Sequence, residues 1–295
     1  MSERSESKGR LPGQHPKLGI AYIFVGALLM AASAILIWYL FLFEGVMLGV
    51  AAVVGGIPMV LGSLLLQRGR RHRAPVGHSP DDTRKPILFL RPFTQDGVQA
   101  FVPVGNLKGA LAWSKTGGRY EDMIRHAFRE MGPILAIGNP GEKLPQTGAA
   151  RAYFSRSDEQ GWKQKVGELL ADSQLVLLQV GDSPGLAWEV KHAVDTLAST
   201  PTCLVLCIPT PRQGLLGLLS RRLRERRRKR MYQAFRELHG SKFPKGLPEK
   251  IGNEQFICFD QDWTPRPAER NGAPLPGEAG PQVTEALNWL SARLS

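Results

Sequence analysis

The sequence predicts a mixed α/β protein in which two membrane-spanning helices precede one domain built on a parallel sheet. Two observations support this prediction. Residues 18–43 and 45–66 carry no charged side chain, and each run exceeds the roughly 20 residues that a helix needs to cross a bilayer. Beyond residue 85, short apolar runs alternate with helical patterns, which is typical of strands joined by crossover helices.

The two apolar runs predict a hairpin of two transmembrane helices, because only a few residues around Glu44 separate them. Ala32-Ser33-Ala34 has the pattern of a signal-peptide cleavage site, but the apolar run continues beyond it and a second run follows. Basic residues gather at 8–17 and at 68–73, which predicts that both termini are cytoplasmic. Neither run contains an ionisable residue, so we expect an anchor rather than a transport pathway.

Residues 1–17 then form a cytoplasmic tail, residues 67–85 a basic juxtamembrane linker, and residues 86–295 the α/β domain. Five strands are expected, at residues 86–90, 133–137, 175–180, 202–208 and 255–259. Five helices are expected, at residues 120–131, 162–171, 184–197, 215–238 and 281–294. This alternation fits a flavodoxin-like parallel five-stranded sheet of order 2-1-3-4-5 with flanking helices.

Ligands of such sheets bind where the strand order reverses, outside the carboxyl ends of the first and third strands. The first strand exits into a segment with Arg91, Phe93 and Asp96, and the third exits toward Asp182. Pro184, preceded by Asp182 and Ser183, predicts the start of a helix.

The second turn of that helix carries Trp188 and Glu189. Glu189 is the candidate catalytic or binding carboxylate, although a carboxylate near a helix N-terminus is also simply stabilised by the dipole. Burial beside Trp188 would raise its pKa and Arg91 would lower it, so the sequence predicts no net direction. We expect Glu189 to face the crevice rather than bulk solvent.

The loop that follows the second strand begins at Gly138, is rich in glycine and polar residues, and extends to Arg151. Glycine permits close approach of the backbone to a ligand, and Arg151 suits a phosphate or carboxylate. The competing interpretation is an ordered loop in which Arg151 pairs with Glu142.

The net charge of +12 is unevenly distributed. Residues 1–80 and 221–230 hold the excess of Lys and Arg, and the rest of the chain is neutral. The expected helix at 215–238 places Met231, Tyr232 and Phe235 after a basic run, which suits contact with anionic lipid headgroups. The membrane-surface candidates are Arg226, Arg227, Arg228 and Arg230. A nucleic-acid role is the runner-up, and a merely solvated basic helix remains open.

Several functional classes lack support in this sequence. There is no GxGxxG after the first strand, and the chain contains no GxxxxGK[ST], HExxH or GxSxG motif. Cys203, Cys207 and Cys258 lie in apolar strand-like runs, with Cys203 and Cys207 expected on one face of a strand, and they predict buried thiols in a reducing compartment. No metal site and no cofactor are expected.

The run ILFLRPFTQD, then YEDMIRHAFREMG, then GLAWEV resembles Toll/interleukin-1 receptor (TIR)-like domains, and more closely bacterial two-span membrane proteins that carry such a domain in the cytoplasm. VGDSPGLAWEVKHAV is similar to the nucleoside deoxyribosyltransferase pattern. The resemblance implies a bacterial inner-membrane location and, in both families, action on N-glycosidic bonds through a Glu that maps onto Glu189.

Two functions follow from these expectations. The first is a membrane-anchored signalling or interaction module. The second is an N-glycosidic bond hydrolase or transferase acting on NAD or a nucleoside, with Glu189 and Asp182 catalytic and Arg91 or Arg151 holding phosphate. The expected partners are the bilayer and an NAD or nucleotide ligand; a homo-oligomer stays open, and nucleic acid is not expected.

Overall fold

The computed structural model describes residues 11, 13–42, 48–74, 76, 82–92, 120–138, 144–145, 149–152, 159–181, 183–208, 221–252, 255–267 and 283–288. The chain divides into two compact units. One comprises Met1–Val76 together with Glu142–Thr147, and the other comprises Gly77–Gly141 with Gly148–Ser295.

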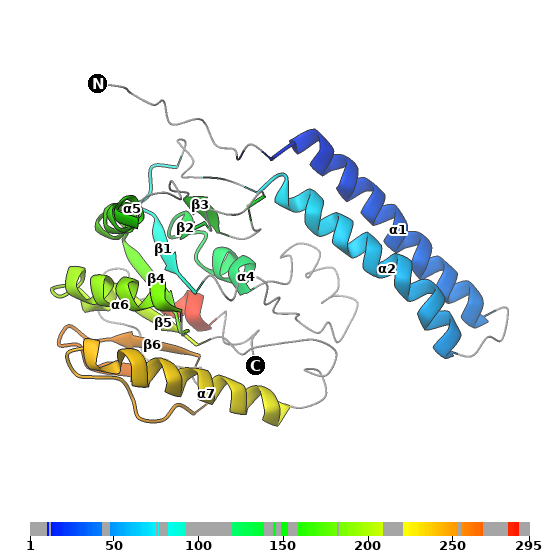
Figure 1. The fold of residues 1–295 in the computed structure, drawn as a ribbon. Helices are drawn as coiled ribbons and strands as arrows, with labels where there is room; N and C mark the ends of the chain where they lie inside the picture. Colours follow the sequence, from blue (N-terminus) through cyan, green and yellow to red (C-terminus); the bar gives the residue numbers. More distant parts are fainter. Residues whose placement is uncertain are drawn as a thin grey trace, which may run out of the picture. The chain divides into compact units, whose positions relative to one another are not determined.

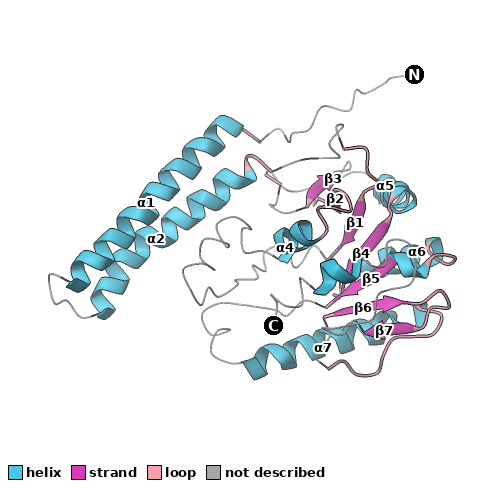
Figure 2. Ribbon diagram, turned by 180° about the vertical axis from the view of Figure 1, so that it is seen from behind, coloured by secondary structure: helices cyan, strands magenta, loops and turns pink. Residues whose placement is uncertain are grey.

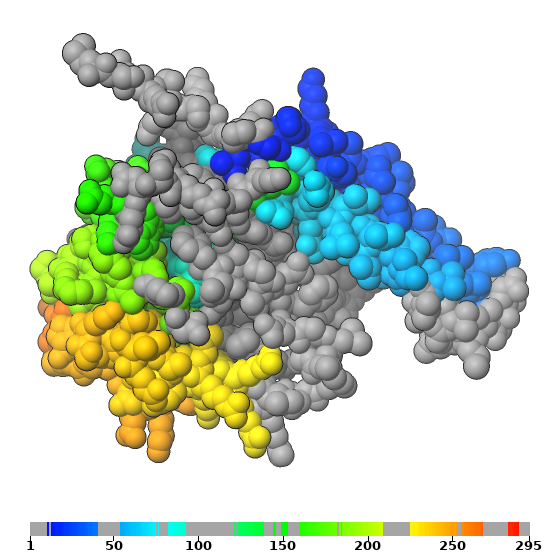
Figure 3. All heavy atoms as spheres, in the orientation of Figure 1, coloured from blue at the N-terminus to red at the C-terminus, as the bar shows by residue number. Residues whose placement is uncertain are grey.

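Helices α1 (Pro16–Leu42) and α2 (Leu48–Arg71) form an antiparallel pair and lie against each other along their length (Figure 3). Glycines allow the close approach. A Cβ added at Gly26 would lie 2.6 Å from the carbonyl oxygen of Gly62, and one added at Gly19 would lie 2.8 Å from that of Gly69. Small residues are what helices use to bring their backbones together in a membrane.

Only α1 meets the requirements of a membrane span within the described part of the chain. Its residues Pro16–Leu40 are long and apolar enough to cross a bilayer, a property that a membrane span and a signal sequence share. Two spans were predicted, and α1 is the helix that passes this test among the described residues. α2 continues past the expected end at residue 66 through Arg68, Arg70 and Arg71.

Polar contacts join the tail before α1 to the end of α2, in a region that the sequence assigned partly to a linker. Gln14 Nε2 donates to the carbonyl oxygens of Arg71 at 3.3 Å and Ala74 at 2.9 Å. The Arg71 guanidinium donates to the carbonyl oxygens of Leu144 at 2.6 Å and Pro145 at 3.2 Å. The segment at 144–145 thus belongs to the helical unit.

Gly62→Leu is expected to force the two helices apart, because a Cβ at residue 62 would already lie 2.7 Å from the carbonyl oxygen of Gly26. Gly56→Leu in the same helix is the matched control, since nothing lies within 4 Å of a Cβ there. Spin labels at Leu28 and Leu64, both exposed, report the interhelical distance. The distance should lengthen with Gly62→Leu alone; equal distances in both variants would contradict the packing.

The second unit is built on a seven-stranded sheet of order β3-β2-β1-β4-β5-β6-β7 (Figure 1). The strands are β1 (Ile87–Leu90), β2 (Ile134–Ile137), β3 (Ala150–Ala152), β4 (Leu175–Gln179), β5 (Leu204–Cys207), β6 (Phe256–Phe259) and β7 (Pro265–Pro267). The five expected strands are present in the expected order.

The prediction of a wholly parallel five-stranded sheet is wrong in two respects. β3 and β7 add an edge strand on each side, and β6 runs antiparallel to both β5 and β7. The remaining pairs, β3–β2, β2–β1, β1–β4 and β4–β5, are parallel, so the sheet is mostly parallel.

Helices cover both faces of the sheet (Figure 2). α5 (Glu159–Asp172), α6 (Pro184–Thr196) and α7 (Arg221–His239) lie on one face, and α4 (Tyr120–Ala127) with the helical residues 283–288 on the other. Side chains alternate between the two layers: Leu88 and Leu90 contact the first group, and Ile87 and Phe89 the second. Both faces are buried, which explains why the strands are almost continuously apolar.

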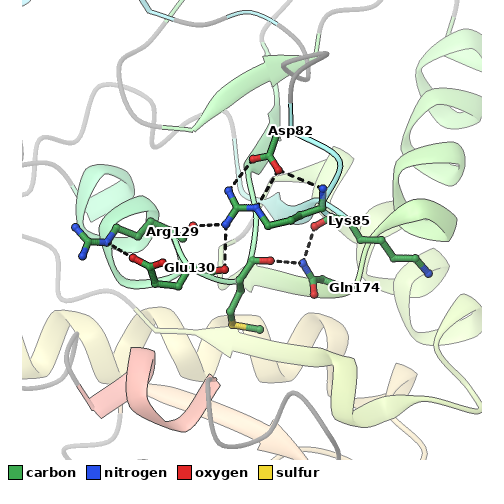
Figure 4. A network of polar contacts seen from close by, with 7 residues as sticks. Asp82, Lys85, Arg129, Glu130 and Gln174 are labelled. Atoms are coloured by element: carbon green, nitrogen blue, oxygen red, sulfur yellow. Dashed lines mark hydrogen bonds and ion pairs between the residues drawn. The ribbon is translucent and has the colours of Figure 1, made fainter.

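At the amino ends of the central strands, a polar network holds the strand starts together (Figure 4). The Arg84 guanidinium pairs with Asp82 and donates to the carbonyl oxygens of Arg129 at 2.8 Å and Glu130 at 3.0 Å. Gln174 Nε2 donates to the carbonyl oxygens of Lys85 and Met131. These bonds satisfy the carbonyls of residues 85 and 129–131, at the edge of the sheet opposite the carboxyl ends of the strands.

Candidate functional site

A cluster of three charged side chains lies at the carboxyl edge of the sheet. Arg91 directly follows β1, Arg151 is the central residue of β3, and Glu121 is the second residue of α4. The Glu121 carboxylate bridges the two arginines: Oε1 lies 2.9 Å from Arg91 Nε, and Oε2 accepts a hydrogen bond of 2.6 Å from Arg151 Nη2.

Strand alternation explains why these groups meet. Ala150 and Ala152 pack toward the layer of α5, α6 and α7, so Arg151 points to the α4 side. In the sheet, Arg151 is level with Ala136, which in turn is level with Phe89, two residues before Arg91. The methyl side chain of Ala136 leaves space between the two arginine-bearing strands on this face.

The cluster is buried and carries an excess of positive charge among its described members. The side chain of Arg151 is 0% exposed, that of Arg91 4% and that of Glu121 15%. Arg151 Nε and Nη1 are buried and have no hydrogen-bond partner among the described residues. Buried N–H donors without an acceptor are costly, on the order of 1–3 kcal/mol each, so Arg151 favours a further anionic acceptor.

Glu189 lies in the second turn of α6 and is 3% exposed, as expected of a residue that faces away from bulk solvent. Burial raises the pKa of its carboxyl group to about 8, and the positive charge of Arg91 opposes that rise. The sequence left the direction undecided because it does not show the depth of burial. With the observed burial, desolvation outweighs Arg91, and Glu189 is mostly protonated at neutral pH.

This shift links stability to pH. The folded pKa lies above the ordinary value of 4.5, so the contribution of Glu189 to stability is fully present below pH 4.5 and is lost as the pH rises through about 8. Glu189→Gln should therefore gain stability relative to the wild type by up to roughly 1.4 kcal/mol per pH unit across this window. Denaturant unfolding at pH 5 and pH 8 tests this; a difference independent of pH would contradict a buried, protonated Glu189.

Trp188, a candidate ligand-binding residue, packs between helices. Its ring stacks on His192 at 4.7 Å and lies 5.1 Å from the ring of Trp162 in α5, while Lys163 Nζ lies 5.8 Å from its centre. Trp188 is partly buried against the core, and its contact with Trp162 contributes to the packing of α5 on α6.

The structure describes some of the other candidates. Gly138 follows β2, and its N–H donates to the carbonyl oxygen of Ala152 at 2.8 Å, so its backbone extends the pairing with β3. Phe93, Asp96 and Asp182 lie outside the described residues. Ser183 is the N-cap of α6 and Pro184 its first residue, as predicted.

The membrane-surface candidates divide into exposed and buried residues. Arg226, Arg227 and Arg230 are exposed, but Arg228 is 1% exposed, donates to the carbonyl oxygen of Gly252, and lies 3.4 Å from Glu225. Assigning Arg228 to a free basic surface was wrong.

The apolar residues that follow the basic run also face the core rather than solvent. Tyr232 and Phe235 are buried in the core, and Met231 packs against it. A lipid-facing apolar side of α7 at these positions is therefore excluded.

The cysteines are structural. All three are free thiols, and burial raises the pKa of Cys258 to about 12, which excludes a reactive thiolate there. Cys203 lies in a 3₁₀ turn (Pro201–Cys203) before β5 and contacts the opposite core layer from Cys207, so the expectation of a shared strand face was wrong. Within the described residues, no group of three His, Cys, Asp or Glu side chains is placed to hold a metal ion.

Glu121 is the site residue that sequence reasoning missed. One signal was available: two arginines, each beside or within an apolar strand, need a buried counter-charge. Glu121 offers it from the first turn of the amphipathic helix that precedes β2. The pair Arg151–Glu121 spans thirty residues, and no local pattern specifies such a contact.

Comparison with known proteins adds no relative: no protein-family model, curated protein or solved structure matches this chain.

Proposed function

We propose that this protein is a membrane-anchored, TIR-like signalling or interaction module of the bacterial inner membrane. In this proposal α1 and α2 form a transmembrane hairpin and both termini are cytoplasmic. The antiparallel packing of the two helices supports it, as do the basic residues before α1 and after α2, which such a hairpin places at the same end. Large apolar side chains on the outer faces, such as Phe24, Ile35 and Val60, suit contact with lipid.

Reporter fusions test the topology. A cytoplasm-active reporter should give signal when fused after residue 80 or residue 295, and a periplasm-active reporter should give signal only near Glu44. Signal from a periplasm-active reporter at either of the first two positions contradicts the hairpin.

The proposed relation to TIR-like and flavodoxin-like domains draws on strand order. The order β2-β1-β4-β5-β6 matches the 2-1-3-4-5 order of flavodoxin-like sheets, with the reversal between β1 and β4. Antiparallel β6 and the two extra edge strands depart from that pattern.

One observation favours a module over a continuously active enzyme: the charged side chains of the site bind one another. Glu121 forms ion pairs with both Arg91 and Arg151, and Glu189 is buried and mostly protonated. A catalytic carboxylate must reach its substrate, whereas a signalling domain can rest in such a closed state and respond when a ligand or partner rearranges it.

A second candidate function is cleavage of a nucleoside N-glycosidic bond, which the raised pKa of Glu189 favours. A carboxyl group that is protonated at neutral pH can donate its proton to a leaving base as water attacks the sugar carbon. This suits a nucleoside, whose base departs more easily when protonated. It suits NAD less well, because nicotinamide departs as a neutral molecule without gaining a proton.

Incubation of the full-length protein with nucleosides and with NAD separates the two candidates. The module proposal predicts that both compounds stay intact, in the wild type and in Glu189→Gln alike. Release of free base from nucleosides by the wild type, lost in Glu189→Gln, would overturn the module proposal and establish the second candidate.

We also propose that the exposed basic side chains of α7 contact anionic lipid headgroups. Arg226, Arg227, Lys229 and Arg230 remain exposed, and each such charge near an anionic leaflet is worth about 1 kcal/mol. Flotation of the full-length protein would mostly report the anchor. The informative measurement is therefore protection of α7 from trypsin in anionic versus neutral nanodiscs. Equal protection in both contradicts lipid contact.

A further inference from the structure

We propose that Arg151 and Arg91 form a receptor for the phosphoryl group of a ligand, and that Glu121 is a built-in counter-anion which this group displaces. The inference deepens the proposed function, because it names the chemistry that would open the closed site. It depends on the arrangement of three described side chains.

The first argument is the number of hydrogen-bond donors. Glu121 supplies two oxygens, one to each arginine, and leaves Arg151 Nε and Nη1 buried without a partner among the described residues. A phosphoryl group offers three oxygens. It can contact Arg91 and Arg151 where the carboxylate does and bind a further N–H of Arg151, which matches the bidentate geometry that guanidinium prefers.

The second argument is charge. Among the described side chains, Arg91 and Arg151 share the carboxylate of Glu121, and Glu189 adds little negative charge while it is protonated. A phosphoryl group with one or two negative charges compensates the arginines at least as well as Glu121 does. Displacement then costs little, because the released carboxylate regains its hydration in water.

The third argument is position. Glu121 is the most exposed member of the cluster, and Arg151 is fully buried beneath it. A ligand therefore reaches Arg151 by taking the place of Glu121. That place adjoins the first turn of α4, where the helix dipole favours an anion.

The test compares Glu121→Gln with the wild type in the purified full-length protein. Thermal unfolding is followed against inorganic phosphate, with acetate at equal ionic strength as the reference anion. If Glu121 competes with the ligand and the open arrangement is a minor state of roughly 1–10%, Glu121→Gln should bind phosphate about tenfold to a hundredfold more tightly. Arg151→Gln should lose the phosphate response, and Arg129→Gln, at an exposed ion pair, should behave as the wild type.

A purely structural role for Glu121 predicts the opposite outcome. Glu121→Gln would then show no gain in phosphate affinity, and that result, or an equal response to acetate, overturns the proposal. If Glu121→Gln does not fold, Glu121→Asp replaces it: the shorter side chain cannot bridge both arginines, and a gain of the same sign is required.

Two further arms identify the source of the phosphoryl group. Tighter binding of AMP than of inorganic phosphate assigns it to a nucleotide, and tighter binding of a short-chain phosphatidic acid assigns it to a lipid headgroup. No arm depends on turnover or on a signalling partner. A negative nucleoside assay therefore leaves this proposal intact, and failure to bind phosphate leaves the proposed module intact.

Discussion

Glu121→Ala is expected to lower the free energy of unfolding by about 3–5 kcal/mol, because it leaves two buried guanidinium groups without their shared carboxylate. This is a large fraction of the stability of an ordinary domain. Urea unfolding of the full-length protein at pH 7, followed by tryptophan fluorescence, measures the change.

Glu130→Ala is the matched control. Glu130 also pairs with an arginine, Arg129, at 2.8 Å, but both side chains are well exposed. Exposed ion pairs contribute about 0–1 kcal/mol, so this variant should unfold close to the wild type. Equal destabilisation by the two substitutions would show that Glu121 is no more important than a surface carboxylate.

Arg228→Glu should destabilise the α/β unit by a similar amount. Arg228 is buried, donates to the carbonyl oxygen of Gly252 and lies near Glu225. The substitution removes that donor and places a second carboxylate beside the first, in a position from which water is excluded. Thermal or urea unfolding at low salt should show the loss.

Arg230→Glu makes the same chemical change two residues along α7, where the side chain is exposed. Its effect should stay within about 0.5 kcal/mol. Similar stability of the two variants would contradict the burial of Arg228. The same comparison guides any test of lipid binding: Arg228 must stay unchanged, or a loss of folding will be mistaken for a loss of membrane contact.

The strands that sequence reasoning found are those with an apolar run long enough to be buried on both faces, such as Leu175–Gln179. β3 and β7 were missed because Ala150–Ala152 and Pro265–Pro267 are three-residue edge strands with arginine at their centres and no hydrophobic pattern. The direction of β6 was missed for another reason. Parallel and antiparallel strands of similar composition differ in the path of the preceding connection, which a strand's own sequence does not record.

The sequence of α7 contains a periodic pattern that could have predicted the burial of Arg228. Arg228, Tyr232, Phe235 and His239 recur at helical spacing and are all buried. That row identifies Arg228 as the polar end of a core-facing stripe. This pattern was missed because residues 221–230 were interpreted together as one exposed basic cluster.

The candidate site was predicted in part. The rule for strand-order reversal led to Arg91 and Glu189, and the loop pattern led to Arg151. What could not be predicted was the long-range contact with Glu121 and the depth of burial, which together decide the charge state. Both depend on tertiary packing of segments far apart in the sequence.

The most direct test of this account is the pKa of Glu189 in the intact protein. Infrared difference spectroscopy during a pH titration, with Glu189→Gln to assign the carboxyl band, measures it. The account predicts a protonated carboxyl at neutral pH that titrates near pH 8. Titration near the ordinary value of 4.5 would mean that Glu189 is solvated or fully paired, and would contradict the closed, desolvated site on which the proposed function depends.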